Sequence, residues 1–540
     1  MSREQTAIRE IWMVSREYGN IAGAGGVKDV VAGLSVTLAR WTGRSVHVVL
    51  PCYGFMQPGK KGFAPLADPL RPDEPLVFET DLNYPDKERK EQIRVWYAKI
   101  EKVNIYLLDA ERFREKLDVY TYSATEEKSQ PWQKKGEGHY DYFAMNILLQ
   151  KAALDLIMLL GASPDIVHCH DGHTAVLPAM IEELPGYRNY FRQTACLVTV
   201  HNAGKGYHQE IADLDFAASS SGLPLDFVQS SRLDDCFDPF LAAGHFALLN
   251  TVSENYAREL RETSDDLLTG WLGHTLLERN IKLEGITNGI NPDVFSAKNP
   301  EQTGVAAAFD LLKDKELTGK KKCKQAILQL LNGKKEIAGI RQSGFLSTDL
   351  SCPLVTFIGR LSNQKGVDEL TRALASLLEK RQDFQFLLLG SGSSRDEAGL
   401  IALAEKNSYA GRIAILRGYD TRLAAKIYAA GDFFVIPSRY EPCGLTDFMA
   451  QLFGNLPIVH HVGGLVKVLD GKTGFAYSTQ SSAALATTIE RALDLFYFDP
   501  TAIRNMQRQA VERIEKHFTW KMVSKKYLAL YKKARKMKLS

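Results

Sequence analysis

The sequence predicts an α/β protein made of two doubly wound parallel-sheet domains. Short apolar runs of strand length alternate with segments of helical periodicity, as βα units require. This alternation runs to about residue 290, stops, and restarts near residue 354. The chain has 540 residues, too many for one hydrophobic core, so two domains facing a central cleft are expected.

The composition is that of a soluble globular protein. Apolar residues make up 45% of the chain and charged residues 24%, and the net charge is only +3. Because so small a charge creates no strong field, we expect neither a nucleic acid nor a membrane as partner. The lysine run at 320–324 is interpreted as a solvated helix face.

The cysteines and the chain start indicate a reduced, cytoplasmic protein. Seven scattered cysteines without C-x-x-C spacing argue against a disulfide framework and against a zinc site. The start, MSREQTAIRE, is polar and unlike a signal peptide. The longest apolar stretch, near 152–160, is shorter than the roughly 18–20 residues that a membrane span needs.

In the first half, an apolar strand is followed by a glycine cluster and a helix that begins after Gly26. A polar stretch at 122–138 is expected to be a loop. The strands predicted in this half are 11–14, 46–50, 93–97, 104–108, 166–169, 196–200, 248–252 and 283–289, with a helix at 140–160.

A connector with a basic helix at 320–331 leads into the second half. The strands predicted there are 354–358, 384–389, 413–416, 433–436 and 457–460, with helices from 367, near 397, and from 422, 445 and 482. The last segment, 521–538, has the pattern of a basic amphipathic helix. The predicted domains are 1–290, 291–518 and the terminal helix 519–540.

The most informative stretch is IPSRYEPCGLT, Ile436 to Thr446. It places a carboxylate, Glu441, and the free N–H groups of a helix start at the end of a buried strand. Open α/β sheets bind ligands at that edge, and a helix start favours phosphate. The alternative is an ordinary strand-to-helix loop with a surface glutamate.

Three further loops of the second half carry suitable groups. FIGRLSNQKG places Arg360 and Lys365 after a strand, where two cations could neutralise a diphosphate. LLLGSGS contains Gly390, and HHVGGL contains the pair Gly463 and Gly464. Each loop alone fits surface charge or a simple turn, but four at one sheet edge indicate a ligand site.

The first half ends its strands in polar groups as well. Gly25 and Gly26 open a helix where a phosphate or a sugar could approach the backbone. Asp171 and His173 follow one strand, and His201 and Asn202 follow the next. A polar pocket is the favoured interpretation. Zinc is the competing one because of HCHDGH, but no ligand set of known spacing completes it, so we predict no metal and no cofactor.

Taken in order, the motifs resemble those of the bacterial and plant-type glycogen (starch) synthase family, retaining glycosyltransferases of the GT-B fold. The resemblance covers nearly the whole chain and includes the family's HDWH, VHN, LNG, RLxxQKG and EPCGLT motifs. The matching segments are VHCHDGHTAVLPAMI, VTVHNAGKGYH, NTVSENYAREL, GITNGINPDVF, FIGRLSNQKGVDEL, IPSRYEPCGLT and TGFAY.

The resemblance implies transfer of glucose from a nucleotide-glucose to the non-reducing end of an α-1,4-glucan, with retention of configuration. The first domain would be the acceptor side and the second would bind the nucleotide sugar. Arg360 and Lys365 would hold the diphosphate, and Glu441 the sugar hydroxyls. The remaining implied donor contacts are the glycine loops named above, Asn288, Cys443, Gly444, Leu445 and Thr446.

On the acceptor side, the resemblance implies that His201 contacts the sugar and that its carbonyl faces the anomeric carbon. Asp171, His173 and Asn202 would line the acceptor side. The terminal helix would pack back on the first domain. The sequence does not indicate an oligomeric state.

One motif departs from the family. Its signature KTGGLADV carries a lysine that reaches the donor, whereas this chain has GAGGVKDV, with Gly23 at that position. Lys28 follows within the predicted helix, and Lys205, in a VHN loop that also departs from the family, is another candidate replacement. The departures leave two alternatives open: a GT-B transferase with another acceptor, or a weakened glucan-binding regulatory homologue.

Overall fold

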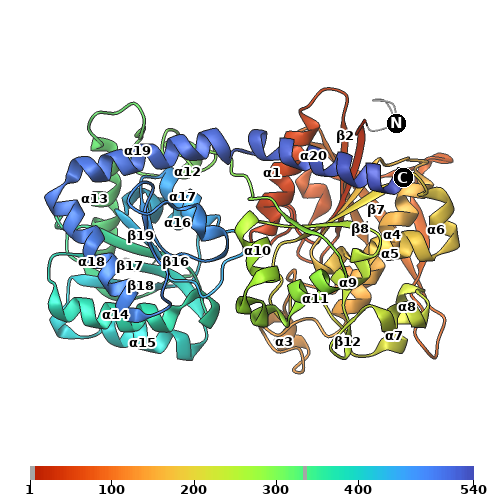
Figure 1. Ribbon diagram of the computed structural model, residues 1–540, viewed down its shortest axis with the longest axis horizontal. Coiled ribbons are helices and arrows are strands. Elements are labelled where there is room, and N and C mark those ends of the chain that lie inside the picture. The colour runs from red at the N-terminus through yellow and green to blue at the C-terminus, as the bar shows by residue number, and fades with distance from the viewer. Residues whose placement is uncertain (1–6, 333–336) are drawn as a thin grey trace. The chain divides into compact units, whose positions relative to one another are not determined.

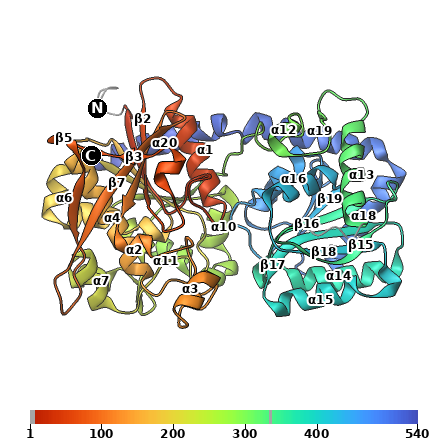
Figure 2. The ribbon, with the colours of Figure 1, turned by 180° about the vertical axis from the view of Figure 1, so that it is seen from behind.

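The computed structural model describes residues 7–332 and 337–540 and divides into two compact units (Figures 1 and 2). Unit 1 comprises the described residues up to Gly289 together with Trp520–Ser540, and unit 2 comprises Ile290–Thr519. The first six residues of the polar N-terminal segment lie outside the described residues. Each unit is described by itself below.

Unit 1 contains a large, mostly parallel sheet. Its strand order is β14-β13-β10-β9-β1-β2-β8-β7-β3, with β6 beside β7. The strands are β1 (Glu10–Val14), β2 (Ser45–Pro51), β3 (Ala64–Pro65), β6 (Val77–Asp81), β7 (Lys90–Ile100), β8 (Val103–Asp109), β9 (Ile166–His170), β10 (Ala195–Val200), β13 (Leu248–Thr251) and β14 (Leu283–Gly285). β7 runs antiparallel to its neighbours, and a small β4 (Ala67–Asp68)–β5 (Arg71–Pro75) pair and a β11 (Arg232–Leu233)–β12 (Cys236–Phe237) pair stand outside the sheet.

The chain leaves β1 in one direction to β2 and β8, and later returns to the other side of β1 with β9, β10 and β13. This reversal makes the sheet doubly wound and places a topological switch point between β1 and β9. The loops after these two strands are therefore the expected ligand position of unit 1.

The helices of unit 1 include one of unusual composition, α4 (Tyr142–Leu159). It is long and apolar enough to cross a membrane, but 78% of it is buried inside the unit, as in a core helix. The others are α1 (Val27–Ala39), α2 (Glu111–Arg114), α3 (Ala124–Ser129), α5 (Leu177–Glu183), α6 (Pro185–Tyr190), α7 (Leu214–Ser221), α8 (Leu225–Ser230), α9 (Pro239–Gly244), α10 (Glu254–Glu262), α11 (Leu272–Glu278) and α20 (Trp520–Leu539).

The stretch 122–138, expected to be a loop, contains α3. The Ser123 hydroxyl accepts from the amide of Glu126, and the Glu126 carboxylate accepts from the amide of Ser123. This reciprocal capping box satisfies end groups that would otherwise be unpaired, so it stabilises a helix that has little apolar pattern of its own.

Helix α20 belongs to unit 1 and packs against β10 and α1. The ring of Trp520 lies over Gly33 of α1 and over Gly289, where an added Cβ would be 2.0 Å and 2.6 Å from ring atoms. The hydroxyl of Tyr531 lies 2.9 Å from Nδ1 of His168. Ion pairs from Lys526, Lys533, Arg535 and Lys538 to acidic residues of unit 1 line the same helix.

Unit 2 contains a seven-stranded sheet in the order β15-β18-β17-β16-β19-β20-β21. From the first parallel strand, β16, this is the Rossmann order 3-2-1-4-5-6 with one antiparallel strand added at the edge. The strands are β15 (Arg341–Leu346), β16 (Leu354–Leu361), β17 (Gln385–Gly392), β18 (Arg412–Arg417), β19 (Phe433–Ile436), β20 (Leu456–His460) and β21 (Phe475–Tyr477). The predicted class, two doubly wound α/β domains, is confirmed, while β15 falls in the predicted connector.

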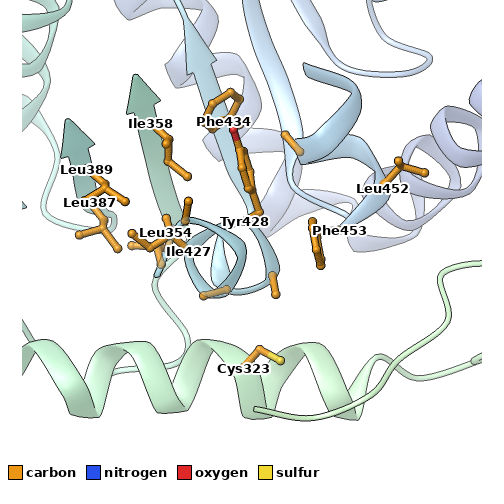
Figure 3. Packing of buried hydrophobic residues seen from close by; sticks show 14 of the residues in the cluster. Cys323, Leu354, Ile358, Leu387, Leu389, Ile427, Tyr428, Phe434, Leu452 and Phe453 are labelled. Atoms are coloured by element: carbon orange, nitrogen blue, oxygen red, sulfur yellow. The ribbon is translucent and has the colours of Figure 1, made fainter. Parts of the chain in front are cut away.

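Both faces of this sheet are covered by helices, so its strands are apolar on both sides. Figure 3 shows residues of the cluster that is buried on one of these faces. Leu354 and Ile358 of β16 pack on one face with Tyr428, whereas Val355 and Phe357 pack on the other. The covering helices are α13 (Thr318–Asn332), α14 (Val367–Lys380), α15 (Ser394–Ala404), α16 (Thr421–Ala430), α17 (Thr446–Leu452), α18 (Ser482–Phe498) and α19 (Pro500–His517), with a short α12 (Pro300–Thr303).

The lysine run at 320–324 is only partly the solvated face that the sequence suggested. Lys320 and Lys324 are buried. The Nζ of Lys320 donates to the carbonyls of Ala429, Gly431 and Phe453 at 3.1, 2.6 and 3.0 Å. Carbonyls left over at the ends of helices and loops need donors, and a buried ammonium supplies three.

Candidate active site

In unit 2 the four predicted loops follow four adjacent parallel strands, β17, β16, β19 and β20. Parallel neighbours end at the same edge, so the loops share one side of the sheet. The switch point lies between β16 and β19. On one side, β16 and the loop after it carry Arg360 and Lys365. On the other side, the loop after β19 carries Glu441.

Lys365 and Glu441 form an ion pair at this switch point. The Nζ of Lys365 lies 2.5 Å from Oε2 of Glu441, and the Ser438 hydroxyl donates to the same oxygen at 3.0 Å. Burial raises the pKa of the Glu441 carboxyl, but the Lys365 ammonium and the Ser438 hydroxyl outweigh it, and the pKa is lowered overall. Glu441 is therefore ionised at neutral pH.

Arg360 lies on β16 itself, opposite Ser391 of β17, and not beyond the strand as expected. The strand extends to Leu361 because its pairing with β17 continues through the glycines of both strands. Arg360 is exposed at this edge.

The two loops at the switch point are bound to each other. The amide of Arg439 donates to the carbonyl of Gln364 at 2.9 Å, and its guanidinium contacts Asp368 and Glu369 at 2.8 and 2.7 Å. Gly366, at φ +64°, faces Pro437, whose carbonyl would be 2.1 Å from an added Cβ. Lys365 and Glu441 thus stand on a rigid pair of loops.

The glycines predicted to bind the donor are first of all required by close approach of main chains. An added Cβ at Gly463 would be 2.0 Å from the carbonyl oxygen of Glu441, and one at Gly464 would be 2.1 Å from that of Cys443. At Gly390 it would be 2.2 Å from the carbonyl oxygen of Gly359. The loop after β20 therefore supports the loop that carries Glu441.

The segment Cys443–Thr446 leads into α17. Gly444 has φ +70°, and Leu445 is the N-cap of the helix, which starts at Thr446. Within the part of the chain that the structure describes, the amides of Gly444, Leu445 and Thr446 donate no hydrogen bond to the protein. These three N–H groups are available to a ligand oxygen.

In unit 1 the glycine loop after β1 is organised differently. Oε2 of Glu17 accepts from the amides of Ala24 and Gly25 at 2.9 and 3.0 Å, and its Oε1 accepts from the hydroxyl of Tyr120. Gly26 is the N-cap of α1. The Gly25 amide, predicted to face the donor, is thus bonded to a carboxylate of the protein.

Gly23 makes room for Lys28. A Cβ added at Gly23 would be 2.4 Å from Cδ and 2.7 Å from Cβ of Lys28. The stem of Lys28 therefore lies directly on the position where the family has its lysine. Its ammonium forms no ion pair within the described ranges 7–332 and 337–540.

Asp171 joins the loops after β9 and β10. It has φ +62°, and its Oδ1 accepts from the amides of His201 and Asn202 at 2.6 and 3.3 Å. Burial raises the pKa of Asp171 to about 8, against the lowering effect of the two amides, which favours the protonated carboxyl at neutral pH. His173 is buried in the same turn, with its ring 5.1 Å from that of Tyr120.

His201 is a neutral imidazole at neutral pH. Burial lowers its pKa to about 3. Its Nε2 lies 3.0 Å from Nδ1 of His170, whose own pKa burial lowers well below the usual range. Asn288, after β14, is buried, and its Oδ1 accepts no hydrogen bond from the described residues.

Three residues that hold these loops were not predicted from the sequence: Glu17, His208 and Lys467. His208 Nδ1 lies 2.7 Å from Oδ2 of Asp238, and Nε2 lies 2.7 Å from the carbonyl oxygen of Ala203. Nothing in a local pattern pairs His208 with Asp238, but a charged residue three positions past the glycine pair could have signalled Lys467. Among the described residues no three His, Cys, Asp or Glu side chains are gathered as metal ligands.

Two family models match the chain. Residues 10–274 match the starch synthase catalytic domain, and residues 352–494 match the glycosyl transferases group 1 model. The first match contains most of unit 1 and the second contains the sheet of unit 2 from β16 onward.

Similar proteins cover the whole chain. Glycogen synthase 1 of Geobacter metallireducens is 30% identical over 98% of this chain and 97% of its own length. Glycogen synthase of Streptococcus pneumoniae strain D39 is 28% identical over 97% of this chain and 99% of its own length. The solved catalytic domain of starch synthase IV from Arabidopsis thaliana, bound to ADP and acarbose, is 25% identical, with a TM-score of 0.76 over 98% of this chain and 99% of that one.

These matches agree with the motif order and with the two doubly wound sheets. The chain belongs to the glycogen and starch synthase family of GT-B glycosyltransferases.

Proposed function

We propose that this glycosyltransferase moves glucose from a nucleotide-glucose, with ADP-glucose favoured over UDP-glucose, to the non-reducing end of an α-1,4-glucan. The observation that carries the proposal is the Lys365–Glu441 pair at the switch point of unit 2, beside three unbonded amides. A cation, an ionised carboxylate and free N–H groups match a diphosphate joined to a hydroxylated sugar.

On the donor side, Lys365 and Arg360 bind the diphosphate and stabilise its charge as it leaves. Glu441 accepts hydrogen bonds from the sugar hydroxyls, since its lowered pKa keeps it ionised. The amides of Gly444, Leu445 and Thr446 donate to sugar and phosphate oxygens. Preorganised donors of this kind act without reorganising during the reaction.

On the acceptor side, the groups of unit 1 are Asp171, His173 and Asn202. His201 contacts the sugar that is transferred, and Asn288 lines the donor side. A neutral His201 exchanges hydrogen bonds with sugar hydroxyls and adds no charge. Its carbonyl faces the anomeric carbon, and glucose is transferred to the same face that the nucleotide leaves. Catalysis rests on positioning and on leaving-group electrostatics.

Two observations support ADP-glucose and the glucan. The Arabidopsis relative was solved with ADP and acarbose. In this chain the stem of Lys28 fills the space beside Gly23, so a lysine side chain lies next to the signature position although the signature lysine is absent. All seven cysteines are free, which supports a reducing, cytoplasmic location.

The test is release of ADP or UDP from the corresponding nucleotide-glucose with glycogen as primer. We expect ADP release that requires the primer, and products lengthened by α-1,4-linked glucose. Folded protein that turns over neither donor would contradict the proposal, as would transfer to a different acceptor.

A second candidate, a weakened glucan-binding homologue, is favoured by two observations. The Gly25 amide is bonded to Glu17 and the signature lysine is missing. This candidate predicts glycogen binding without nucleotide release, so the same assay separates the two.

A further inference from the structure

Lys467 is a buried lysine directly beneath the loop that carries Glu441. It follows the glycine pair of the loop after β20 and is 9% exposed. Its Nζ donates to the carbonyls of Cys443, Gly444 and Gly464, the last two at 2.7 and 3.0 Å. It also lies 3.1 Å from Oδ1 of Asp447 and over the ring of Phe448.

These contacts account for all the donors of the ammonium. A lysine has three N–H groups, and three main-chain carbonyls accept them while Asp447 balances the charge. Burying a charge is costly unless it is paired and hydrogen-bonded, so the site is built around this ion. None of the motifs that identify the family includes it.

The direction of the carbonyls fixes the direction of the amides. A trans peptide is planar, so its C=O and N–H groups point to opposite sides, and no peptide bond in the described chain is cis. The carbonyls of Cys443 and Gly444 point at Lys467. The amides of the same two peptide groups, those of Gly444 and Leu445, therefore point away from it, and both are without an acceptor in the described protein.

We propose that Lys467, together with Asp447, is a positioning residue for donor binding: it holds the carbonyls of the Glu441 loop on the buried side and so presents the amides of Gly444 and Leu445 to the nucleotide sugar. This inference rests on the proposed function, because it takes the nucleotide sugar as the ligand of that loop. Lys467 itself touches neither the donor nor the reacting atoms.

The same unit offers a matched control. Lys320 is buried to a similar extent and also donates to three main-chain carbonyls. Its carbonyls, however, belong to the segments that precede β19 and β20, at the opposite edge of the sheet. Removing the ammonium of Lys320 therefore leaves three buried carbonyls without their donor, as removal of Lys467 does, without changing the donor loop.

The experiment compares K467M with K320M, and measures the melting temperature, kcat, and KM for donor and for glycogen. We expect K467M to raise the donor KM about tenfold or more, since the two amides that the loop presents to the ligand lose their fixed direction. Its KM for glycogen should stay unchanged. K320M should lower the melting temperature and leave the donor KM within about twofold.

Because K467M leaves Asp447 buried without its partner, the double variant K467M/D447N is made in parallel. It removes the orphaned carboxylate and is expected to recover melting temperature but not the donor KM. Binding of ADP and of UDP, measured by calorimetry, should weaken in both Lys467 variants and not in K320M.

A donor KM and nucleotide affinity that change no more in the Lys467 variants than in K320M would overturn the inference while leaving the proposed function intact. A wild-type protein that neither binds nor turns over a nucleotide sugar would instead overturn the proposed function, and the inference with it.

Discussion

The loops at the switch points of the two units are organised by buried ions of opposite sign. In unit 1 the carboxylate of Glu17 takes the amides of Ala24 and Gly25. In unit 2 the ammonium of Lys467 takes the carbonyls of Cys443, Gly444 and Gly464. A buried carboxylate accepts hydrogen bonds from main-chain N–H groups. A buried ammonium donates to main-chain carbonyls instead and leaves the N–H groups without an acceptor.

The difference teaches that a glycine-rich loop at a switch point is not by itself an anion site. Both units have the same winding and a glycine-containing loop at the switch point, but Glu17 takes two amides of the loop in unit 1, whereas Lys467 takes only carbonyls of the loop in unit 2. The charge of one buried side chain outside the glycine pattern thus sets which main-chain groups of each loop are bonded internally.

The largest effect is expected from the ion pair in unit 2. K365M should lower kcat by about 100-fold or more, since it removes charge stabilisation of the leaving group. It also leaves Glu441 buried without a cation, so the melting temperature should fall. The double variant K365M/E441Q should recover melting temperature and not turnover. Turnover restored in the double variant would show that the pair is only structural.

In unit 1 the ion pair of His208 and Asp238 is expected to make stability depend on pH. Burial alone would lower the pKa of His208, but Asp238 outweighs it and raises the pKa to about 9. The pair therefore contributes fully below about pH 6.5, and its contribution, at most roughly 3 kcal/mol of unfolding free energy, is lost as pH rises through 9.

Urea unfolding at pH 6 and at pH 9.5 measures this change. H208Q should remove most of the difference between the two pH values, whereas H517Q, at an exposed histidine of unit 2, should keep it. A wild-type protein equally stable at both pH values would contradict a charged His208.

The role of Glu17 separates the two units most directly. E17Q should cost roughly 1–3 kcal/mol of unfolding free energy, since two amides and the Tyr120 hydroxyl lose a charged acceptor. If unit 1 does not receive the anion, the affinity for ADP should change less than about twofold, in contrast to the Lys467 variants. Tighter binding of ADP to E17Q would show that Glu17 competes with the phosphate, and the comparison would then fail.

The smallest effect is expected at Lys28. K28M should raise the donor KM only about two- to fivefold, and less at high salt, as for a partly solvated charge. K60M, at an exposed lysine of the same unit, is the matched control and should have no effect. An unchanged donor KM in K28M would show that Lys28 does not replace the signature lysine.

The fold was largely predictable because its signals are local. Apolar runs such as Phe433–Ile436 and the glycines that follow Val14 mark strands and turns within a few residues. β15 was missed because it is an edge strand with a weak alternation, and α3 because a capping box and not an apolar face stabilises it.

The candidate residues were predictable, but not what holds them. Lys365 and Glu441 lie 76 positions apart and meet only because β16 and β19 are neighbours. The glycines were interpreted as room for a ligand, and Gly463 and Gly464 instead give room to the backbone of Glu441 and Cys443. Buried ions such as Glu17 have no sequence signature, since their partners are backbone groups.

The position of Trp520 has a consequence for how the chain can be divided into fragments. Unit 1 is completed by the 21 residues Trp520–Ser540. Unit 2 is one continuous segment, which in the sequence lies between the two parts of unit 1. Ile290–Thr519 can therefore be produced as one fragment, whereas a fragment that stops at Gly289 lacks the helix that packs against β10 and α1. Cutting the chain at Gly289 thus removes part of unit 1 and leaves unit 2 whole.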